Sequence, residues 1–406
     1  MTRTRPDLGT YDDIAEAARR STGLSDFGGT DHEEGLRLLC DDLAEHGGLT
    51  PVGHYVQRAQ IKSALVSRLV AEQGFKDNPA HAEVRIERPI FVTGLPRTGT
   101  TALHRLLTAD PRHQGLELWL TEVPMPRPPR DTWADNPIYA HLHAAYADHH
   151  VSNPEFMGIH FMDAASVEEC WRVLRQSGRS ISFESLAYIP DYSQWLAEAD
   201  WTPAYLRHRR NLQLVGLNDT EKRWVLKNPS HLVALDALMA VYPDALVVQT
   251  HRDPVTAIAS ACSLSAEATK GWSTVFVGER IGRTQLDMLA RSAQRFASAR
   301  SAYPAAQFVD VDYSDFVADP VATTAGIYDA FGLDWTPEVD AAVRQIDAES
   351  RQGAKRPSHR YDLADYGLTE DEVRGRFVWA RVSRRFGTSQ SQGSDHTKPT
   401  GHRCDQ

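Results

Sequence analysis

Residues 88–107, with the sequence RPIFVTGLPRTGTTALHRLL, constrain the fold more than any other stretch of the chain. Ile90, Phe91 and Val92 form a continuous apolar run, which is typical of a strand buried on both faces of a parallel sheet. Gly94 and Gly99 punctuate the turn that follows, and leucines then recur at helical spacing. We therefore predict a strand, a loop and a helix that begins near Thr100.

This loop is predicted to bind an anion. Backbone N–H groups, the positive end of a helix dipole and the hydroxyls of Thr98, Thr100 and Thr101 would converge on one point. The spacing matches the ATP- and GTP-binding pattern G-x-x-x-x-G-K-[ST], except that Thr100 stands where the lysine belongs. That lysine grips the β- and γ-phosphates, so its absence argues against a triphosphate substrate. An ordinary turn in which a threonine caps the helix is the alternative.

Charge and composition limit which ligands the protein could bind and where in the cell we expect it. The formal net charge of −10 over 406 residues disfavours a general nucleic-acid-binding surface, so a local basic cluster must attract the anion. We expect no integral membrane segment, because no run approaches the about 20 apolar residues of a membrane span. The four scattered cysteines show no metal-ligand spacing, and the N-terminus lacks the apolar stretch of a signal peptide. We expect free thiols, no bound metal and a cytoplasmic protein.

The remaining chain divides into three predicted parts. Residues 1–80 are predicted to form a helical region packed on the core, residues 81–386 an α/β domain and residues 387–406 a disordered tail. Three further strands, over 224–227, 245–250 and 307–311, precede predicted helices over 230–241, 254–264 and 313–331. This alternation predicts an α/β fold with a doubly wound parallel sheet, a P-loop-like strand-loop-helix and helical N-terminal and insert regions. The N-terminal helices could also mediate a homodimer.

Ligands of such sheets bind at the carboxyl ends of the strands. The residues that directly follow three of the predicted strands are 94–101, 227–231 and 251–254. We therefore expect Arg97, Lys227 and Arg252 to surround one crevice.

Two motifs at these positions resemble those of the sulfotransferases that use 3′-phosphoadenosine 5′-phosphosulfate, particularly the bacterial branch. In that family the pattern P-[KR]-[ST]-G-T-T holds the 5′-phosphosulfate, and an arginine with a serine eight residues later binds the 3′-phosphate. The first pattern is matched by Pro96, Arg97, Thr98, Gly99, Thr100 and Thr101, and the second by Arg252 and Ser260. Arg97 replaces the lysine usual in the animal cytosolic enzymes, and their C-terminal R-K-G-x-x-G loop is absent.

The resemblance implies a sulfotransferase that moves a sulfuryl group from this nucleotide to a hydroxyl of a small molecule, lipid or sugar. The implied transfer is in-line and metal-independent. Arg97 would stabilise the leaving oxygen and Lys227 the bridging or sulfuryl oxygens. A P-loop-type kinase or other phosphotransferase, and a non-catalytic nucleotide-binding protein on the same scaffold, are the alternatives.

The acceptor hydroxyl also needs a general base. We expect His231, after the strand over 224–227, to point into the crevice and act as this base, and a structural histidine at a helix start is the alternative. Helix-end electrostatics, with Ser166 as an N-cap, would also explain the nearby acids Glu168 and Glu169. The other candidate bases are Glu169, Glu168, Asp163 and His160.

Overall fold

The computed structural model describes residues 7–152, 163–352 and 362–377. Its centre is a five-stranded sheet in the order β2-β3-β1-β4-β5, in which all neighbouring strands are parallel. The strands are β1 Ile90–Gly94, β2 His113–Gln114, β3 Arg223–Lys227, β4 Leu246–His251 and β5 Phe308–Asp312. The predicted α/β fold with a parallel sheet is confirmed.

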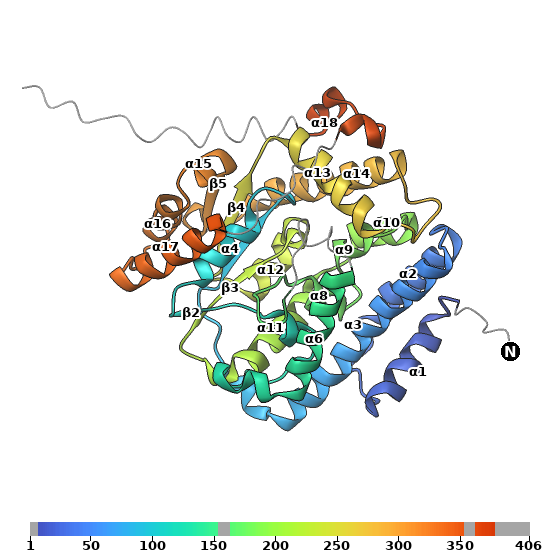
Figure 1. The fold of residues 1–406 in the computed structure, drawn as a ribbon, viewed down its shortest axis with the longest axis horizontal. Helices are drawn as coiled ribbons and strands as arrows, with labels where there is room; N and C mark the ends of the chain where they lie inside the picture. Colours follow the sequence, from blue (N-terminus) through green and yellow to red (C-terminus); the bar gives the residue numbers. More distant parts are fainter. Residues whose placement is uncertain (1–6, 153–162, 353–361, 378–406) are drawn as a thin grey trace, which may run out of the picture.

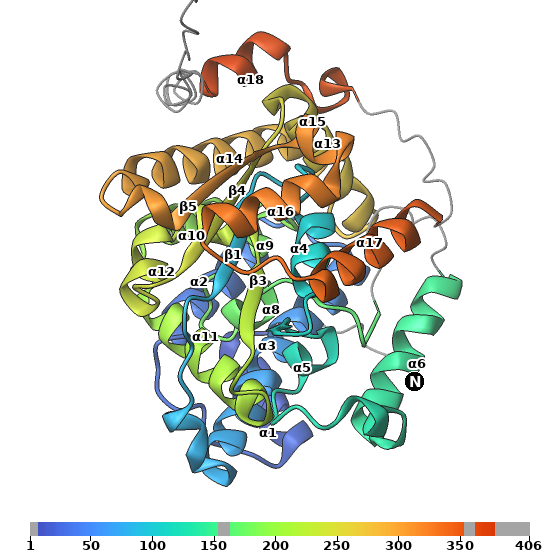
Figure 2. The same ribbon diagram turned by 90° about the vertical axis from the view of Figure 1, so that its left-hand side faces the viewer.

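Helices cover both faces of this sheet (Figures 1 and 2). They are α4 Thr100–Thr108, α5 Leu118–Glu122, α6 Pro137–Ser152, α8 Trp171–Arg175, α9 Ile181–Glu184, α10 Pro190–Glu198, α11 Thr202–Val215, α12 Leu235–Val241, α13 Pro254–Ala268, α14 Glu279–Arg300, α15 Tyr313–Ala318, α16 Pro320–Ala330, α17 Pro337–Gln352 and α18 Glu370–Arg376. Successive side chains of a strand point to opposite faces. Accordingly, Phe91 packs in one hydrophobic cluster, and Ile90 and Val92 pack in the other.

Strand β1 lies at the middle of the sheet and is buried along its whole length, as its apolar run predicts. Val92 is in register with Lys227 of β3, and Gly94 with Thr250 of β4. The chain leaves β1 toward β2 and β3 on one side and later builds β4 and β5 on the other. The point where the strand order reverses, which is where α/β sheets bind ligands, is therefore the carboxyl end of β1.

Three long helices form the described N-terminal part: α1 Tyr11–Thr22, α2 Glu33–Glu45 and α3 Pro51–Asp77. They lie side by side at one flank of the molecule (Figure 1). Leu36 of α2 and Leu65 of α3 are fully buried in the same cluster as Phe91 of β1. The helices predicted within residues 1–80 are thus confirmed, and they share a hydrophobic core with the sheet.

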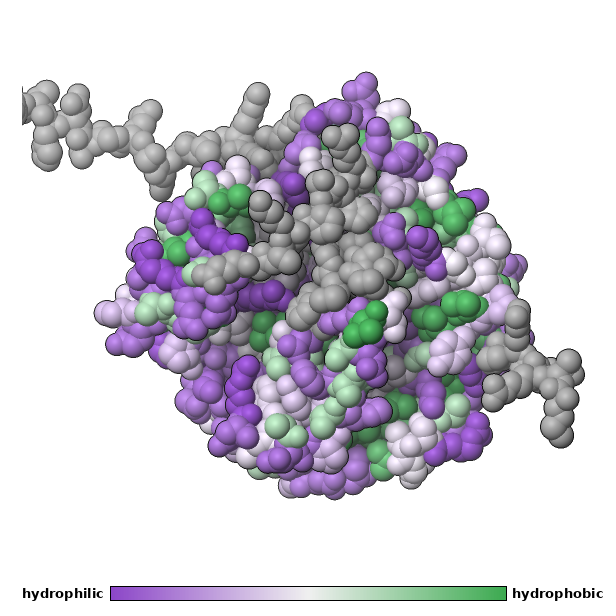
Figure 3. All heavy atoms as spheres, in the orientation of Figure 1, coloured by the Kyte–Doolittle hydropathy of each residue, from purple (hydrophilic) through white to green (hydrophobic). Residues whose placement is uncertain are grey.

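The surface of the described residues carries few large exposed hydrophobic side chains. They are Val52, Tyr55, Val151, Leu206, Val277 and Val317, which come from different parts of the chain. On the face drawn in Figure 3, hydrophobic residues are dispersed among hydrophilic ones. No helix within the described ranges is long and apolar enough to cross a membrane.

Two predicted helices differ from the structure. Residues 230–241 form a 3-10 turn, η4 Pro229–Leu232, followed by α12, and residues 313–331 break into α15 and α16. The second break falls at Asp319, because the residue before a proline is disfavoured in helical conformation. The two-residue strand β2 was not predicted, since it is too short to show a periodic pattern. The predicted tail, residues 387–406, lies outside the described residues.

Candidate active site

The loop between β1 and α4 contains three residues with positive φ: Gly94 at 148°, Arg97 at 70° and Gly99 at 89°. A Cβ on Gly94 would lie 2.3 Å from the Thr250 hydroxyl oxygen, so only glycine fits there. Arg97 adopts the left-handed conformation at a cost of about 1 to 3 kcal/mol, which the surrounding structure must offset. Such turns direct successive backbone N–H groups into one concavity, where an anion binds.

The start of α4 also suits an anion. Gly99 is the N-cap residue, and no side chain caps the first turn of this nine-residue helix. The first-turn N–H groups and the positive end of the dipole are therefore available to a ligand oxyanion. The residues of the loop thus fit the phosphosulfate group that the family motif implies, and Pro96 lies half-buried within the same turn.

The three threonines of the motif have different surroundings. Thr98 is buried, and its hydroxyl donates to the Leu95 carbonyl at 2.6 Å and lies 2.5 Å from the Thr250 hydroxyl. Thr100 is buried in the first turn of α4, whereas Thr101 is exposed. Thr98 therefore stabilises the loop and its contact with β4, and Thr101 presents its hydroxyl to the crevice.

The two sequence motifs meet at Arg97. Its Nε donates to the Ser260 hydroxyl at 3.2 Å, and Arg252 Nη1 donates to the Arg97 carbonyl at 2.8 Å. The Arg252 guanidinium also lies over the Tyr313 ring, 4.2 Å from its centroid. Residues more than 150 positions apart are thus joined at the carboxyl ends of β1 and β4, as the strand-end prediction requires.

Lys227 and Glu169 lie beside Thr101 at the start of α4. Lys227 is only 2% exposed, and its ammonium group is paired with the Glu169 carboxylate and donates to Thr101 Oγ1 at 3.1 Å. Asn228 Nδ2 donates to the other Glu169 oxygen at 3.1 Å. The Cys170 amide donates to the Lys227 carbonyl at 3.0 Å, which ties this segment to the end of β3. Glu169 is therefore oriented beside the loop that begins α4.

The helix-end explanation of Glu169 is wrong. Helix α8 begins at Trp171, its N-cap is Cys170, and no side chain caps it, so Ser166 is not the N-cap. Glu169 precedes the helix and uses its carboxylate on Lys227 and Asn228 instead.

His231 does not face an open crevice. Its side chain is fully buried, its Nδ1 lies 2.6 Å from the Tyr205 hydroxyl, and its ring packs edge-on against Phe91. Burial, followed by the neighbouring His208, lowers the pKa of His231 well below its usual value. After Asn228 the chain forms the 3-10 turn η4, and this turn places the imidazole of His231 in the core. This geometry supports the alternative of a neutral structural histidine.

The other candidate bases lie in different settings. Glu168 is almost completely buried, and its carboxylate accepts a hydrogen bond from the Glu169 amide at 2.8 Å. Asp163 accepts from the Ala165 amide at 3.0 Å, which closes a local turn. His160 lies outside the described residues.

Sequence reasoning missed three residues of the site: Asn228, Thr250 and Tyr313. Asn228 carried a signal, because an asparagine before a proline favours a turn, and its side chain caps η4 by accepting from the Ser230 amide at 2.7 Å. The contacts of Thr250 and Tyr313 depend on which strands are neighbours, which the sequence alone does not show.

Comparisons with known proteins identify the family of this chain. A family model described as the sulfotransferase family matches residues 89–337. The crystal structure of sulfotransferase STF1 from Mycobacterium tuberculosis is 53% identical, with a TM-score of 0.86, and the match covers 92% of this chain and 99% of that one. Sulfotransferase STF9 from Mycobacterium avium is 28% identical with a TM-score of 0.80, covering 92% and 96% of the two chains.

A curated relative is more distant. The omega-hydroxy-beta-dihydromenaquinone-9 sulfotransferase Stf3 of Mycobacterium bovis is 24% identical over 259 residues. The match covers 60% of this chain, and the chain spans 63% of the length of that relative.

Proposed function

The chain belongs to the sulfotransferase family, and on this premise we propose that it transfers a sulfuryl group from 3′-phosphoadenosine 5′-phosphosulfate to an acceptor hydroxyl. Membership of the family implies a sulfate donor. The main support for the proposal is that Ser260 and Arg252 both form hydrogen bonds with Arg97, at the carboxyl ends of β1 and β4. These contacts mean that two cations and a hydroxyl lie beside the loop that we propose to bind the phosphosulfate.

We assign the two ends of the donor to two groups of residues. The loop residues Pro96, Arg97, Thr98, Gly99, Thr100 and Thr101 would hold the 5′-phosphosulfate. Arg252 and Ser260 would bind the 3′-phosphate, with the Arg252 guanidinium kept in place by the Arg97 carbonyl and the Tyr313 ring. Charge-assisted hydrogen bonds of this kind each contribute about 1.5 to 3 kcal/mol.

In the proposed reaction the acceptor oxygen forms a bond to the sulfur of the donor while the bond between that sulfur and the bridging phosphate oxygen breaks, and adenosine 3′,5′-bisphosphate leaves. Glu169, rather than His231, is assigned as the base that takes the acceptor proton, because its carboxylate is partly exposed beside Thr101. The ion pair with Lys227 keeps Glu169 oriented, and Lys227 lies where it can also offer positive charge to the transferred group. Arg97 would stabilise the leaving oxygen. Since Arg97 and Lys227 supply positive charge, the proposed transfer needs no metal ion.

Sulfuryl transfer is favoured over the phosphotransferase alternative. The matching family and the relatives reported above are sulfotransferases. The sequence supports the same choice, because Thr100 replaces the lysine that binds the β- and γ-phosphates in kinases and other triphosphate-binding proteins.

The proposed acceptor is a hydroxyl of a small molecule, lipid or sugar. The relative named for a hydroxylated dihydromenaquinone supports including lipids in this class. A cytoplasmic location and a homodimer remain predictions.

The test is transfer of labelled sulfate from the nucleotide donor to a panel of hydroxylated prenylquinones, hydroxy fatty acids, phenols and sugars. We expect a labelled product that wild-type protein forms and the Glu169→Gln variant does not. Binding of adenosine 3′,5′-bisphosphate without transfer to any acceptor would favour the non-catalytic alternative, and absence of both would refute the proposal.

A further inference from the structure

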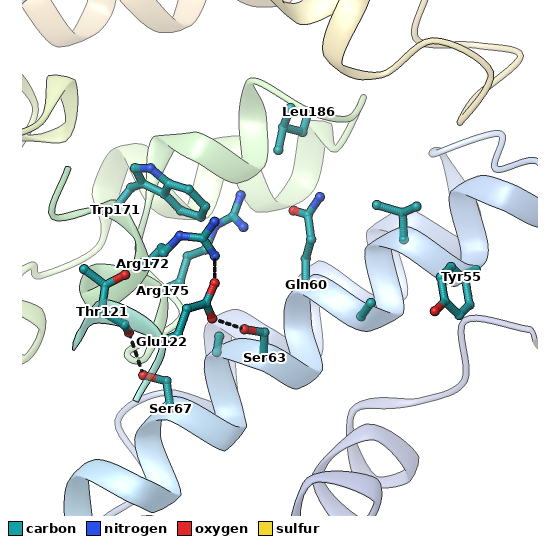
Figure 4. A pocket seen from close by; sticks show the side chains of 13 residues that line it. Tyr55, Gln60, Ser63, Ser67, Thr121, Glu122, Trp171, Arg172, Arg175 and Leu186 are labelled. Atoms are coloured by element: carbon teal, nitrogen blue, oxygen red, sulfur yellow. Dashed lines mark hydrogen bonds and ion pairs between the residues drawn. The ribbon is translucent and has the colours of Figure 1, made fainter. Parts of the chain in front are cut away.

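A cavity of about 440 Å³ lies between helices α3, α5 and α8 (Figure 4). Its inner end is formed by the buried residues Ser67 and Thr121, and its outer end by Tyr55, whose side chain is 64% exposed. The volume falls within the range of small-molecule pockets in proteins. The cavity is lined by apolar side chains together with polar and charged ones. The charges that these side chains leave unbalanced therefore indicate the charge of its ligand.

One ion pair on the cavity wall is internally satisfied. The Glu122 carboxylate is paired with Arg172 and accepts hydrogen bonds from Ser63 at 2.9 Å and from Tyr146 at 3.2 Å. Figure 4 shows Arg172, Glu122 and Ser63 linked in a row along the wall. Glu122 is therefore fully occupied, and its charge is balanced by Arg172.

A second arginine on the same wall has no such partner. Arg175 is only 4% exposed, and no carboxylate of the described residues lies within 4 Å of its guanidinium. Its Nε donates to the Ser182 hydroxyl at 2.8 Å and its Nη2 to the Ser182 carbonyl at 3.3 Å. Its guanidinium lies over the rings of Trp171 and Phe183, at 4.3 and 4.4 Å from their centroids. These contacts fix its position without neutralising its charge.

A buried charge without a counter-charge is costly, and such groups gather at functional sites. Burial, followed by the neighbouring Arg172, lowers the pKa of Arg175 to about 9, so the guanidinium remains charged at neutral pH. Two further buried atoms on the wall, Gln60 Oε1 and Arg172 Nε, have no hydrogen-bond partner among the described residues. One donor, Arg172 Nε, thus lacks an acceptor here, one amide oxygen lacks a donor, and the charge of Arg175 lacks a counter-charge.

The cavity lies close to Glu169 along the chain. Trp171, which lines the cavity, follows two residues after Glu169, whose carboxylate is paired with Lys227. The backbone between them is tied to the end of β3 by the hydrogen bond from Cys170 to the Lys227 carbonyl. An acceptor with its hydroxyl at Glu169 could therefore extend along α8 into the cavity.

We propose that this cavity binds the body of the acceptor, and that the acceptor carries an anionic group, a carboxylate or a phosphate, which pairs with Arg175. This inference rests on the proposed sulfotransferase function, and it narrows the substrate to amphiphilic hydroxy acids or hydroxylated phosphate esters. Gln60 would accept a hydrogen bond from a second hydroxyl or an amide of the same molecule.

The test uses matched pairs of probes that differ only in charge. An ω-hydroxy fatty acid and a hydroxybiphenyl carboxylate are each compared with the corresponding amide by calorimetry, and then as acceptors of labelled sulfate. A charge-assisted contact worth about 1.5 to 3 kcal/mol corresponds to roughly 10- to 100-fold tighter binding of the carboxylate. Equal binding of acid and amide, or preferred transfer to a neutral hydroxylated prenylquinone, would overturn the proposal.

Variants test whether Arg175 causes the tighter binding of the acid than of the amide. Arg175→Gln should abolish the preference for the acid, and Arg175→Lys should retain part of it. Arg179→Gln is the matched control, because Arg179 is also buried and lies over an aromatic ring, Trp195, but does not line the cavity. If Arg175→Gln does not fold, the comparison of acid and amide on wild-type protein still decides.

Two outcomes separate this inference from the proposed function. Acids that bind at Arg175 but neither accept sulfate nor inhibit its transfer would indicate a separate anion site and overturn the acceptor assignment. Binding of adenosine 3′,5′-bisphosphate is measured on the same samples. If that nucleotide binds and the acids do not, the donor assignment stands and the acceptor inference alone fails.

Discussion

The proposed site has a donor half, made of the loop 94–101 with Arg252 and Ser260, and an acceptor half, made of Glu169 and the cavity beside α8. Backbone turns and helix starts at neighbouring strand ends form the donor half, where Arg252 and Ser260 both contact Arg97. Side chains from helices far apart in the sequence form the acceptor half, such as Glu122 and Arg172. The donor half can therefore stay constant while side-chain changes in the acceptor half alter what is sulfated.

The largest effect should come from Glu169, the proposed base of the acceptor half. Glu169→Gln removes the proton acceptor but keeps the shape, so kcat should fall by about 100- to 10,000-fold, as for the loss of other general bases. The dissociation constant of adenosine 3′,5′-bisphosphate should stay within about twofold, because the donor half is untouched. Glu168→Gln, measured beside it, is the matched control, and a near-normal rate for Glu169→Gln would make Glu169 a structural residue.

Arg252→Ala should affect the donor half alone. Loss of a charge-assisted contact to the 3′-phosphate should raise the donor KM and the dissociation constant of the bisphosphate by about 10- to 100-fold. Steady-state kinetics and equilibrium dialysis measure the two quantities. The partly exposed Arg374, which pairs with Asp253 at 2.9 Å, provides the control Arg374→Ala. Equal losses in both variants would mean a general electrostatic effect rather than a specific contact.

Ser260→Ala should have a smaller effect in the same half. The Ser260 hydroxyl accepts from Arg97 Nε at 3.2 Å, and because the hydroxyl itself carries no charge, we expect its loss to cost about 0.5 to 1.5 kcal/mol, less than the loss of the Arg252 guanidinium. We expect donor affinity to fall about 2- to 10-fold, measured by the same dialysis, with Ser263→Ala in the same helix as control. No change would remove Ser260 from the proposed donor contacts.

His231→Gln should lower stability but leave activity nearly unchanged. Its pKa is depressed in the folded protein, so the unfolded state binds an extra proton below the usual histidine pKa of about 6.5. Stability should therefore fall with pH below that value, by up to about 1.4 kcal/mol per pH unit for each such histidine. His208 has a pKa lowered by burial to about 3 and contributes in the same way.

Urea unfolding at pH 7 and pH 5 measures this effect. The variant should lose part of the pH dependence, together with about 1 to 3 kcal/mol of stability for the Tyr205 hydroxyl left without its partner. A variant with normal stability and a rate reduced more than 100-fold would restore His231 as the base.

Much of the donor half could be predicted from the sequence. Gly94 and Gly99, the threonines between two strand ends and the spacing of Arg252 and Ser260 are local patterns with a fixed structural meaning. Parallel strands end at the same edge of a sheet, so the strand positions alone predicted that Arg97, Lys227 and Arg252 lie at one edge. The family resemblance, confirmed by the match over residues 89–337, gave the same result.

The acceptor half could not be predicted in the same way. Glu169 reaches Lys227 across 58 positions, and only the packing of its segment against β3 brings the two together. His231 follows a predicted strand end, but the turn at Asn228-Pro229 buries it instead. The cavity arises where α3 passes α8, and no local pattern marks Arg175 as an arginine without a counter-charge.

The most direct test is calorimetric titration of wild-type protein with adenosine 3′,5′-bisphosphate, adenosine 5′-monophosphate and ATP with Mg²⁺. We expect the bisphosphate to bind most tightly, and Arg252→Ala to reduce its affinity to that of the monophosphate. Absence of bisphosphate binding, or tighter binding of ATP with Mg²⁺, would contradict the assignment of the site to a sulfonucleotide donor.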